Sequence, residues 1–168
     1  MKKKSWILSG ILTCTLCTTA ILPFTTVHAE ISQAASVKAT TNLSASQLLK
    51  QITTGIELPS QRPMNIEMFK DTYKVNRAYL KSYQVNAPIM NVHSNEIAVF
   101  QLKNKKYMNK VLPQIEQRLE NIQNNAFYPE QVTIARKGKV VTKGNYILLV
   151  VDQNVTKIIN NFKKSIDS

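Results

Sequence analysis

Few residues of this chain could do acid–base chemistry, and two of them stand close together. His93 precedes Glu96 by three positions, and it is the only histidine after residue 28. Such a pair could act as base and acid if a pocket brought both onto one substrate. The alternative is a histidine in a solvated turn. Two ligands are too few for a metal site and no others follow at a recognised spacing, so we predict no metal and no cofactor.

Glu96 begins an apolar stretch, where a carboxylate must face solvent or pair with a cation such as Arg118. A structural salt bridge or protection of an edge strand is one interpretation, and a catalytic acid is the other. Tyr128, which follows Phe127, could pack in the core or at a hinge, or take part in binding. His93, Glu96, Arg118 and Tyr128 together form a candidate polar site.

Recognised catalytic motifs are absent from the sequence. The chain has no Gly-x-Ser-x-Gly elbow, no phosphate loop and no dinucleotide fingerprint, and its acids form no compact pair. This absence favours a binding role. The alternative is a small hydrolase or transferase of the cell envelope that uses Glu96 and His93.

Two groups of basic residues contain no acid among them. The first is Lys103, Lys105, Lys106 and Lys110, and the second is Arg136, Lys137, Lys139 and Lys143. Both fall at expected strand ends or hairpin tips, so they could share one edge of a sheet and attract a polyanion. The alternative is that they only form a solvated surface.

The N-terminus has the layout of a secretory signal. Three lysines at 2–4 precede an apolar run over 6–22, and Val27-His28-Ala29 suits a signal peptidase, so we expect cleavage after Ala29. A retained membrane anchor is the alternative, but the run is shorter than most spanning helices. Residues 30–43 are polar and predict a flexible leader, and residues 44–168 predict a single domain.

Cleavage would change both the charge and the thiol content. The signal holds three of the 22 basic residues and none of the 10 acidic ones, so the mature chain has 19 basic and 10 acidic residues. The signal also holds both cysteines, Cys14 and Cys17. The mature chain could then form no disulfide. An exported protein with a net positive charge is attracted to anionic wall polymers, membrane surfaces or envelope proteins. The alternative is that the charge serves only to keep the protein soluble. We do not expect nucleic acid as a partner, and the sequence leaves the oligomeric state open.

Apolar periodicity predicts the elements that must position these residues. Ser44 can cap a helix with Leu48, Leu49 and Ile52 on one side, ending near Gly55. A helical piece over 66–73 or 76–82 is weakly indicated. Alternation over 83–89 and the apolar run 97–102 predict two antiparallel strands.

The second half has the stronger pattern. Apolar residues at spacings of three and four over 108–122 predict the longest helix, which either bends or begins at Pro113. The segment 132–136 fits a helical turn or a strand. Residues 139–142 and 146–151 predict a hairpin whose second arm is a doubly buried strand, and 155–166 predict an amphipathic closing helix.

These elements predict an α+β fold in the order α-β-β-α-β-β-α. We expect a four-stranded, mostly antiparallel sheet with the helices packed on one face, because that layout would bury every apolar stripe.

Several short motifs resemble a known family. They are Asn95-Glu96-Ile97-Ala98-Val99-Phe100, the helix that carries Arg118, Phe127-Tyr128-Pro129-Glu130-Gln131, and the strand motif at 143–151. Over 44–168 the chain resembles the exported or lipid-anchored proteins of Gram-positive bacteria that form domain of unknown function 4358. Many members carry a lipidated cysteine, whereas here Thr13 and Leu16 precede the two cysteines and no lipobox is present.

The resemblance implies the compartment and the fold, and it brings no reaction or site residue. We therefore expect a non-catalytic binding or accessory domain of the cell envelope that engages an anionic polymer, a lipid surface or a partner protein through its basic edge. A further alternative is an assembly subunit that docks an exposed apolar surface on a partner.

Overall fold

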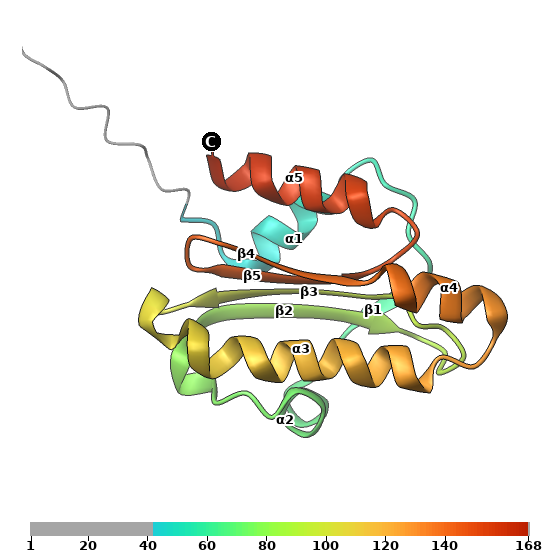
Figure 1. The fold of residues 1–168 in the computed structure, drawn as a ribbon. Coiled ribbons are helices and arrows are strands. Elements are labelled where there is room, and N and C mark those ends of the chain that lie inside the picture. The colour runs from blue at the N-terminus through green and yellow to red at the C-terminus, as the bar shows by residue number, and fades with distance from the viewer. Residues whose placement is uncertain (1–41, 168) are drawn as a thin grey trace, which may run out of the picture. The chain divides into compact units, whose positions relative to one another are not determined.

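The folded unit is built on a five-stranded antiparallel sheet with the strand order β1-β2-β3-β5-β4 (Figure 1). A computed structural model describes residues 42–167, which form an α+β fold. The predicted signal and nearly all of the predicted leader lie outside the described residues. Among the helices within 42–167, none has the length and hydropathy of a membrane span.

The two central strands hold the sheet together. β3 (Glu96–Leu102) and β5 (Tyr146–Val151) are buried at every position. They pair antiparallel, with Glu96 opposite Val151 and Gln101 opposite Tyr146. Because successive side chains of a strand point to opposite faces, each of these strands supplies apolar side chains to two separate cores.

The outer strands are more exposed. β2 (Leu80–Pro88) pairs with β3, and the short edge strand β1 (Gln61–Pro63) pairs with β2. β4 (Lys139–Lys143) forms the other edge and returns into β5 through a two-residue turn. Gly144 in this turn has a φ of 57°, a conformation that glycine adopts without steric cost.

One face of the sheet is covered by α1 (Ala45–Thr53) and α5 (Val155–Asp167) (Figure 1). The predicted cap of α1 is confirmed: Ser44 accepts a hydrogen bond from the Gln47 amide in a capping box. Ile158 and Phe162 of α5 pack with Leu48 of α1 in the core on this face.

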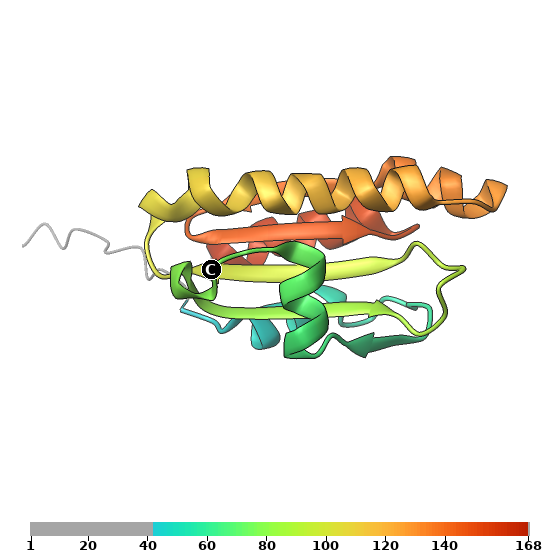
Figure 2. The same ribbon diagram turned by 90° about the horizontal axis from the view of Figure 1, so that it is seen from below.

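The other face is covered by α2 (Ile66–Tyr73), α3 (Met108–Asn125) and α4 (Pro129–Lys137). Figure 2 shows α3 lying along the strands and α2 crossing them. Two short 3₁₀ helices, η1 (Arg77–Tyr79) and η2 (Lys105–Tyr107), lead into β2 and α3.

The structure corrects the expected sheet in two respects. The helices cover both faces and not one, because the continuous apolar runs of β3 and β5 present apolar side chains to both sides. The sheet also has a fifth strand, β1. Its Pro63 lacks a backbone donor, which an edge strand tolerates.

Two open points in the helices are settled. α3 runs as one helix from Met108 through Pro113, so it neither begins at nor ends before the proline. The ambiguous segment at 132–136 lies within α4, which begins with Pro129 at its first turn and has Glu130 beside it.

Candidate functional site

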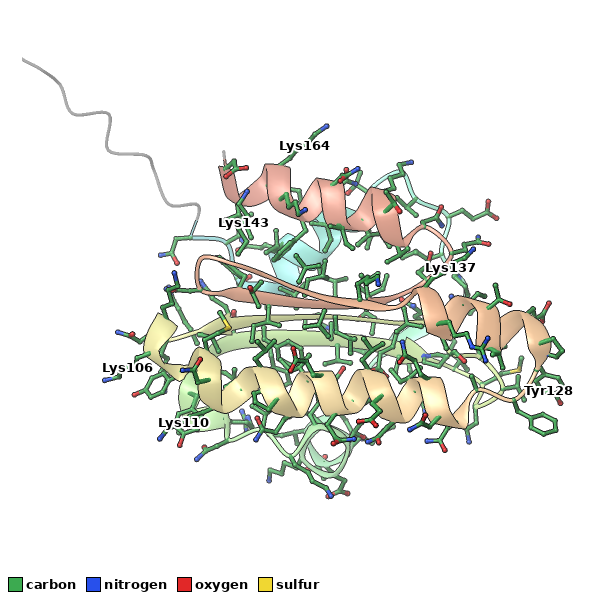
Figure 3. The ribbon with its side chains drawn as sticks, in the orientation of Figure 1. Lys106, Lys110, Tyr128, Lys137, Lys143 and Lys164 are labelled. Carbon is green, nitrogen blue, oxygen red and sulfur yellow. The ribbon has the colours of Figure 1, made fainter. Side chains whose placement is uncertain are left out.

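The predicted basic edge is divided between the two ends of the sheet. At one end, which we call the lysine end, β3 finishes at Leu102 and β5 begins at Tyr146. At the other end, the pocket end, β3 begins at Glu96. Lys143 pairs with Tyr146 and Lys139 with Val150, so β4 alone places one predicted lysine at each end. Figure 3 shows Lys106 and Lys110 far from Lys137.

The lysine end is formed by the turn between β3 and α3. Its Lys103, Lys105, Lys106 and Lys110 are all exposed, and we call these four residues the lysine cluster. Asn104 fixes the turn, because its Oδ1 accepts a hydrogen bond of 2.9 Å from the Lys106 amide. The Lys103 amide donates to the Tyr79 carbonyl oxygen at 3.0 Å, which ties the turn to η1.

Two stacked tyrosines support the lysine cluster. The rings of Tyr79 and Tyr107 lie 4.7 Å apart between centroids. The Nζ atom of Lys106 is 5.3 Å from the centre of the Tyr107 ring, and that of Lys110 is 5.5 Å from the centre of the Tyr79 ring. These cation–π contacts favour ammonium groups near the aromatic surface without neutralising their charge.

The charges of the lysine cluster oppose the dipole of α3. The first turn of this helix contains Lys110 and no acid, and η2 places Lys105 and Lys106 just before it. Cations at a helix N-terminus are unfavourable, since the unpaired amides there carry partial positive charge. Within residues 42–167, no carboxylate forms a salt bridge with the cluster.

Of the other predicted basic residues, only Lys143 forms a salt bridge among the described residues. Arg136 and Lys137 occupy the last turn of α4, where a cation is favoured by the helix dipole. Lys143 forms an ion pair with Asp167 of α5 and donates to the Lys163 carbonyl oxygen at 2.9 Å. Lys139 is exposed at the first position of β4.

The pocket end contains a buried cluster of Glu96, Arg118 and Tyr73. Arg118 Nη2 lies 2.6 Å from Glu96 Oε2, and Arg118 Nε donates to Glu96 Oε1 at 3.0 Å. Tyr73 Oη donates to the same Oε1 at 2.6 Å. The predicted salt bridge between Glu96 and Arg118 is therefore present, and Tyr73 is a third member that the sequence did not indicate.

Burial and the charge of Glu96 together shift the pKa values of Tyr73 and Arg118. Desolvation raises the pKa of Tyr73 well above its usual value, and the nearby Glu96 carboxylate raises it further. Burial alone would lower the pKa of Arg118, but the hydrogen bonds and charge of Glu96 outweigh it and raise that pKa. The cluster therefore holds a neutral tyrosine and a charged Arg118–Glu96 pair.

A pocket of about 180 Å³ opens between the β2–β3 loop and the C-terminal half of α3. It is lined by Pro88, Asn91, His93, Ser94, Glu96, Arg118, Asn121, Ile122, Asn125 and Ala126. Arg118 is 23% exposed, whereas Glu96 is 1% exposed. Three residues of the candidate polar site, His93, Glu96 and Arg118, thus meet in one pocket.

Hydrogen bonds hold the β2–β3 loop in place beside this pocket. The Ser94 amide donates to Gln131 Oε1 of α4 at 2.8 Å, and Asn95 Nδ2 donates to Asp152 Oδ2 at 3.1 Å. Asp152 is itself fully buried at the end of β5. The end of the loop that follows His93 therefore has a defined position relative to α4 and to the end of β5.

Exposed apolar side chains gather around the pocket end. Ile89, Met90 and Val92 of the loop are 46–55% exposed, and Phe127 and Tyr128 are 85% and 49% exposed. Tyr128 lies in the connection from α3 to α4, at the far end of the molecule from Lys106 (Figure 3). It packs edge-on against Phe127, with ring centroids 5.5 Å apart, and not in the core.

Sequence reasoning missed the asparagines of the pocket and the paired tyrosines. Asn121 and Asn125 are one helical turn apart on α3, and this spacing could have indicated a shared polar surface. Nothing in the sequence links Tyr79 to Tyr107, because their contact depends on η1 and η2 lying side by side. Among the described residues, no three His, Cys, Asp or Glu side chains are grouped to hold a metal ion.

Comparison with known proteins adds one match. Residues 55–152 match the family model described as a domain of unknown function (DUF4358), and this span includes both ends of the sheet. Neither the curated proteins nor the solved structures gave a significant match.

Proposed function

The chain belongs to the DUF4358 family, and we propose that it is a non-catalytic binding domain of the bacterial cell envelope. In this proposal the lysine cluster engages an anionic polymer outside the membrane, to which the signal predicted at 1–29 would deliver the protein.

The observation that carries the proposal is the placement of the cluster against the dipole of α3. Lysines at a helix N-terminus with no acid nearby lower the stability of that helix, typically by about 0.3–1 kcal/mol each. Departures from local stability rules are expected at functional sites. An anion bound at this end would interact favourably with both the lysines and the dipole of α3.

The enzymatic alternative places Glu96 and His93 on one substrate. Both residues line the pocket, but both carboxylate oxygens of Glu96 already accept hydrogen bonds from Arg118 and Tyr73. An acid or base must exchange a proton with its substrate. This geometry therefore favours a role in which Glu96 positions Arg118.

The test compares two variants that each lose three charges. One is Lys105→Gln, Lys106→Gln and Lys110→Gln, and the other is Arg136→Gln, Lys137→Gln and Lys139→Gln. We expect the first to weaken binding to isolated Gram-positive cell walls roughly 100-fold, since each lysine near an anionic surface contributes about 1 kcal/mol. The second should retain most of the affinity.

Binding by the unsubstituted chain should fall steeply between about 0.05 and 0.5 M salt, because added ions screen the attraction. Walls stripped of phosphate polymers should bind poorly, and vesicles of anionic lipid test the membrane surface as an alternative target. Equal losses in both variants would refute a localised site and would indicate attraction through net charge alone.

A further inference from the structure

We infer that the pocket between the β2–β3 loop and α3 binds a neutral saccharide. Its lining includes Asn91, Asn121 and Asn125, and a side-chain amide carries two donors and an acceptor. The Oδ1 atom of Asn121 also accepts a hydrogen bond of 3.4 Å from Gln117, which leaves it one lone pair. Saccharide hydroxyls need donors and acceptors together, because each hydroxyl can serve as both. Arg118 adds the N–H groups that Glu96 does not occupy.

The charge of the pocket favours a neutral ligand. Its titratable lining residues are His93, Glu96 and Arg118, and the last two cancel, so the formal charge is zero with His93 counted as neutral. An anion at the remaining N–H groups of Arg118 would be repelled by the neighbouring Glu96 carboxylate, which already balances the charge of Arg118. The cation in the pocket is paired, whereas the lysine cluster has no carboxylate partner among residues 42–167, and so the pocket and the cluster favour different ligands.

The polar groups of the pocket are positioned before any ligand binds. Arg118, Asn121 and Asn125 fall at spacings of three and four on α3, so they share one face of a rigid helix. On the opposite side, the Ser94 amide bond to Gln131 fixes the loop. Preorganised groups lose little conformational entropy when they form hydrogen bonds to a ligand.

An exposed aromatic pair adjoins the pocket. Ala126 lines the pocket and Phe127 and Tyr128 follow it directly, with their rings at 84° to each other. Pro129 begins α4 immediately afterwards and restricts the backbone of Tyr128 to an extended conformation. Aromatic faces carry partial negative charge, and the C–H groups of a pyranose ring can pack against them.

A second hollow extends the binding surface. It has a volume of about 340 Å³ and is lined by Ser60, Ile89, Met90 and His93. His93 also lines the first pocket, so the two hollows both lie next to this one residue. A ligand with more than one sugar ring could occupy both.

The experiment follows backbone and side-chain amide signals of the folded domain by NMR during titration with two neutral trisaccharides. Chitotriose carries N-acetyl groups, and maltotriose carries hydroxyls alone. We expect one or both to shift the signals of Asn91, Asn121 and Asn125, with an affinity on the order of millimolar for so small a pocket. The two arms separate acetamido recognition from hydroxyl recognition.

A matched pair of variants locates the site. Asn121→Ala with Asn125→Ala should weaken saccharide binding about tenfold or more, because several hydrogen bonds are lost. Asn124→Ala changes an exposed neighbour that does not line the pocket and should leave binding unchanged. Unchanged dispersion of the amide signals in each variant shows that the fold is intact.

Other results would overturn the inference. One is that neither saccharide shifts the pocket signals up to about 20 mM, which is well above the expected dissociation constant. A second is that Asn124→Ala weakens binding as much as the double variant does. A third is that trialanine or inorganic phosphate shifts the pocket signals and the saccharides do not. The lysine variant of the previous section should bind saccharide normally. Wall binding by electrostatics and saccharide binding can therefore fail independently.

Discussion

Arg118 and the lysine cluster, at opposite ends of the sheet, are cations in opposite surroundings. At the pocket end, Arg118 is paired with the buried Glu96 and is part of the packing between α3 and β3. At the lysine end, four exposed lysines have no carboxylate partner among residues 42–167 and stand against the dipole of α3. The difference shows that burial and partners, more than the number of charges, decide whether a cation stabilises the fold or remains available to a ligand.

The comparison is tested most strongly by removing one cation from each end of α3. Arg118→Met should lower the free energy of unfolding by about 3 kcal/mol, because Glu96 would remain as a buried carboxylate without a counter-charge. Lys110→Met, on the same helix, should raise it by about 0.3–1 kcal/mol, because a cation is removed from the N-terminus of α3. Urea unfolding at pH 7 measures both, and similar losses would contradict the distinction.

Two glycines, one at each end of the sheet, allow the packing of the two ends to be compared. A Cβ at Gly138, where α4 meets β4 at the pocket end, would lie 2.7 Å from Leu119 Cδ1 and 2.9 Å from the Ala135 carbonyl oxygen. Gly138→Ala should therefore cost about 2 kcal/mol through overpacking.

Gly144, at the lysine end, has open space around it, and only its positive φ penalises a side chain. Gly144→Ala should cost about 1 kcal/mol. Urea midpoints measured in parallel would rank the two substitutions, and the reverse order would show that the pocket end is less tightly packed than the structure indicates.

The hydroxyl of Tyr73 offers a further test of the buried cluster. Tyr73→Phe should lower the free energy of unfolding by about 1 kcal/mol at pH 7, because Glu96 loses one of its three donors. The Arg118 bonds to Glu96 remain, so the loss is smaller than for Arg118→Met.

The pH dependence of this effect has a defined sign. Burial raises the pKa of Tyr73 in the folded chain, so its contribution is complete below a pH of about 10 and is lost as pH rises toward the folded pKa. Tyr73→Phe should therefore lose less stability than the unsubstituted chain in alkali. Burial also raises the pKa of Tyr146, so part of the alkaline loss should persist in the variant. Tyrosinate absorbance followed alongside unfolding would reveal an early ionisation of Tyr73 that contradicts this view.

Much of the local structure followed from the sequence. Ser44 predicts the N-terminal cap of α1, and the continuous apolar runs predict β3 and β5. The segment at 132–136 was ambiguous because its β-branched residues suit a strand as well as a helix. Pro129 and Glu130 at the start of α4 gave the deciding helix signal, which lies outside that segment.

The candidate sites were less predictable. Glu96 needed a cation wherever it was buried, so its pairing with Arg118 could be expected from chemistry. The Asn-lined pocket could not, because α3 and the β2–β3 loop are joined only by packing and by bonds such as that from Ser94 to Gln131. The prediction that both basic groups share one edge was wrong, because residues at the two ends of a strand are separated by the length of that strand. Lys139 and Lys143 stand at opposite ends of β4 in this way.

The sequence by itself determined strands β2 to β5, helices α1, α3 and α5, the order of these elements and the excess of basic residues, because helix caps, apolar periodicity and charge are local properties of the chain. Tertiary structure alone decided which face each helix covers, which lysines stand together and which polar side chains meet in a pocket. Those outcomes depend on contacts between residues far apart in the chain, and one-dimensional patterns do not record which of several ways of burying the same apolar surface is adopted.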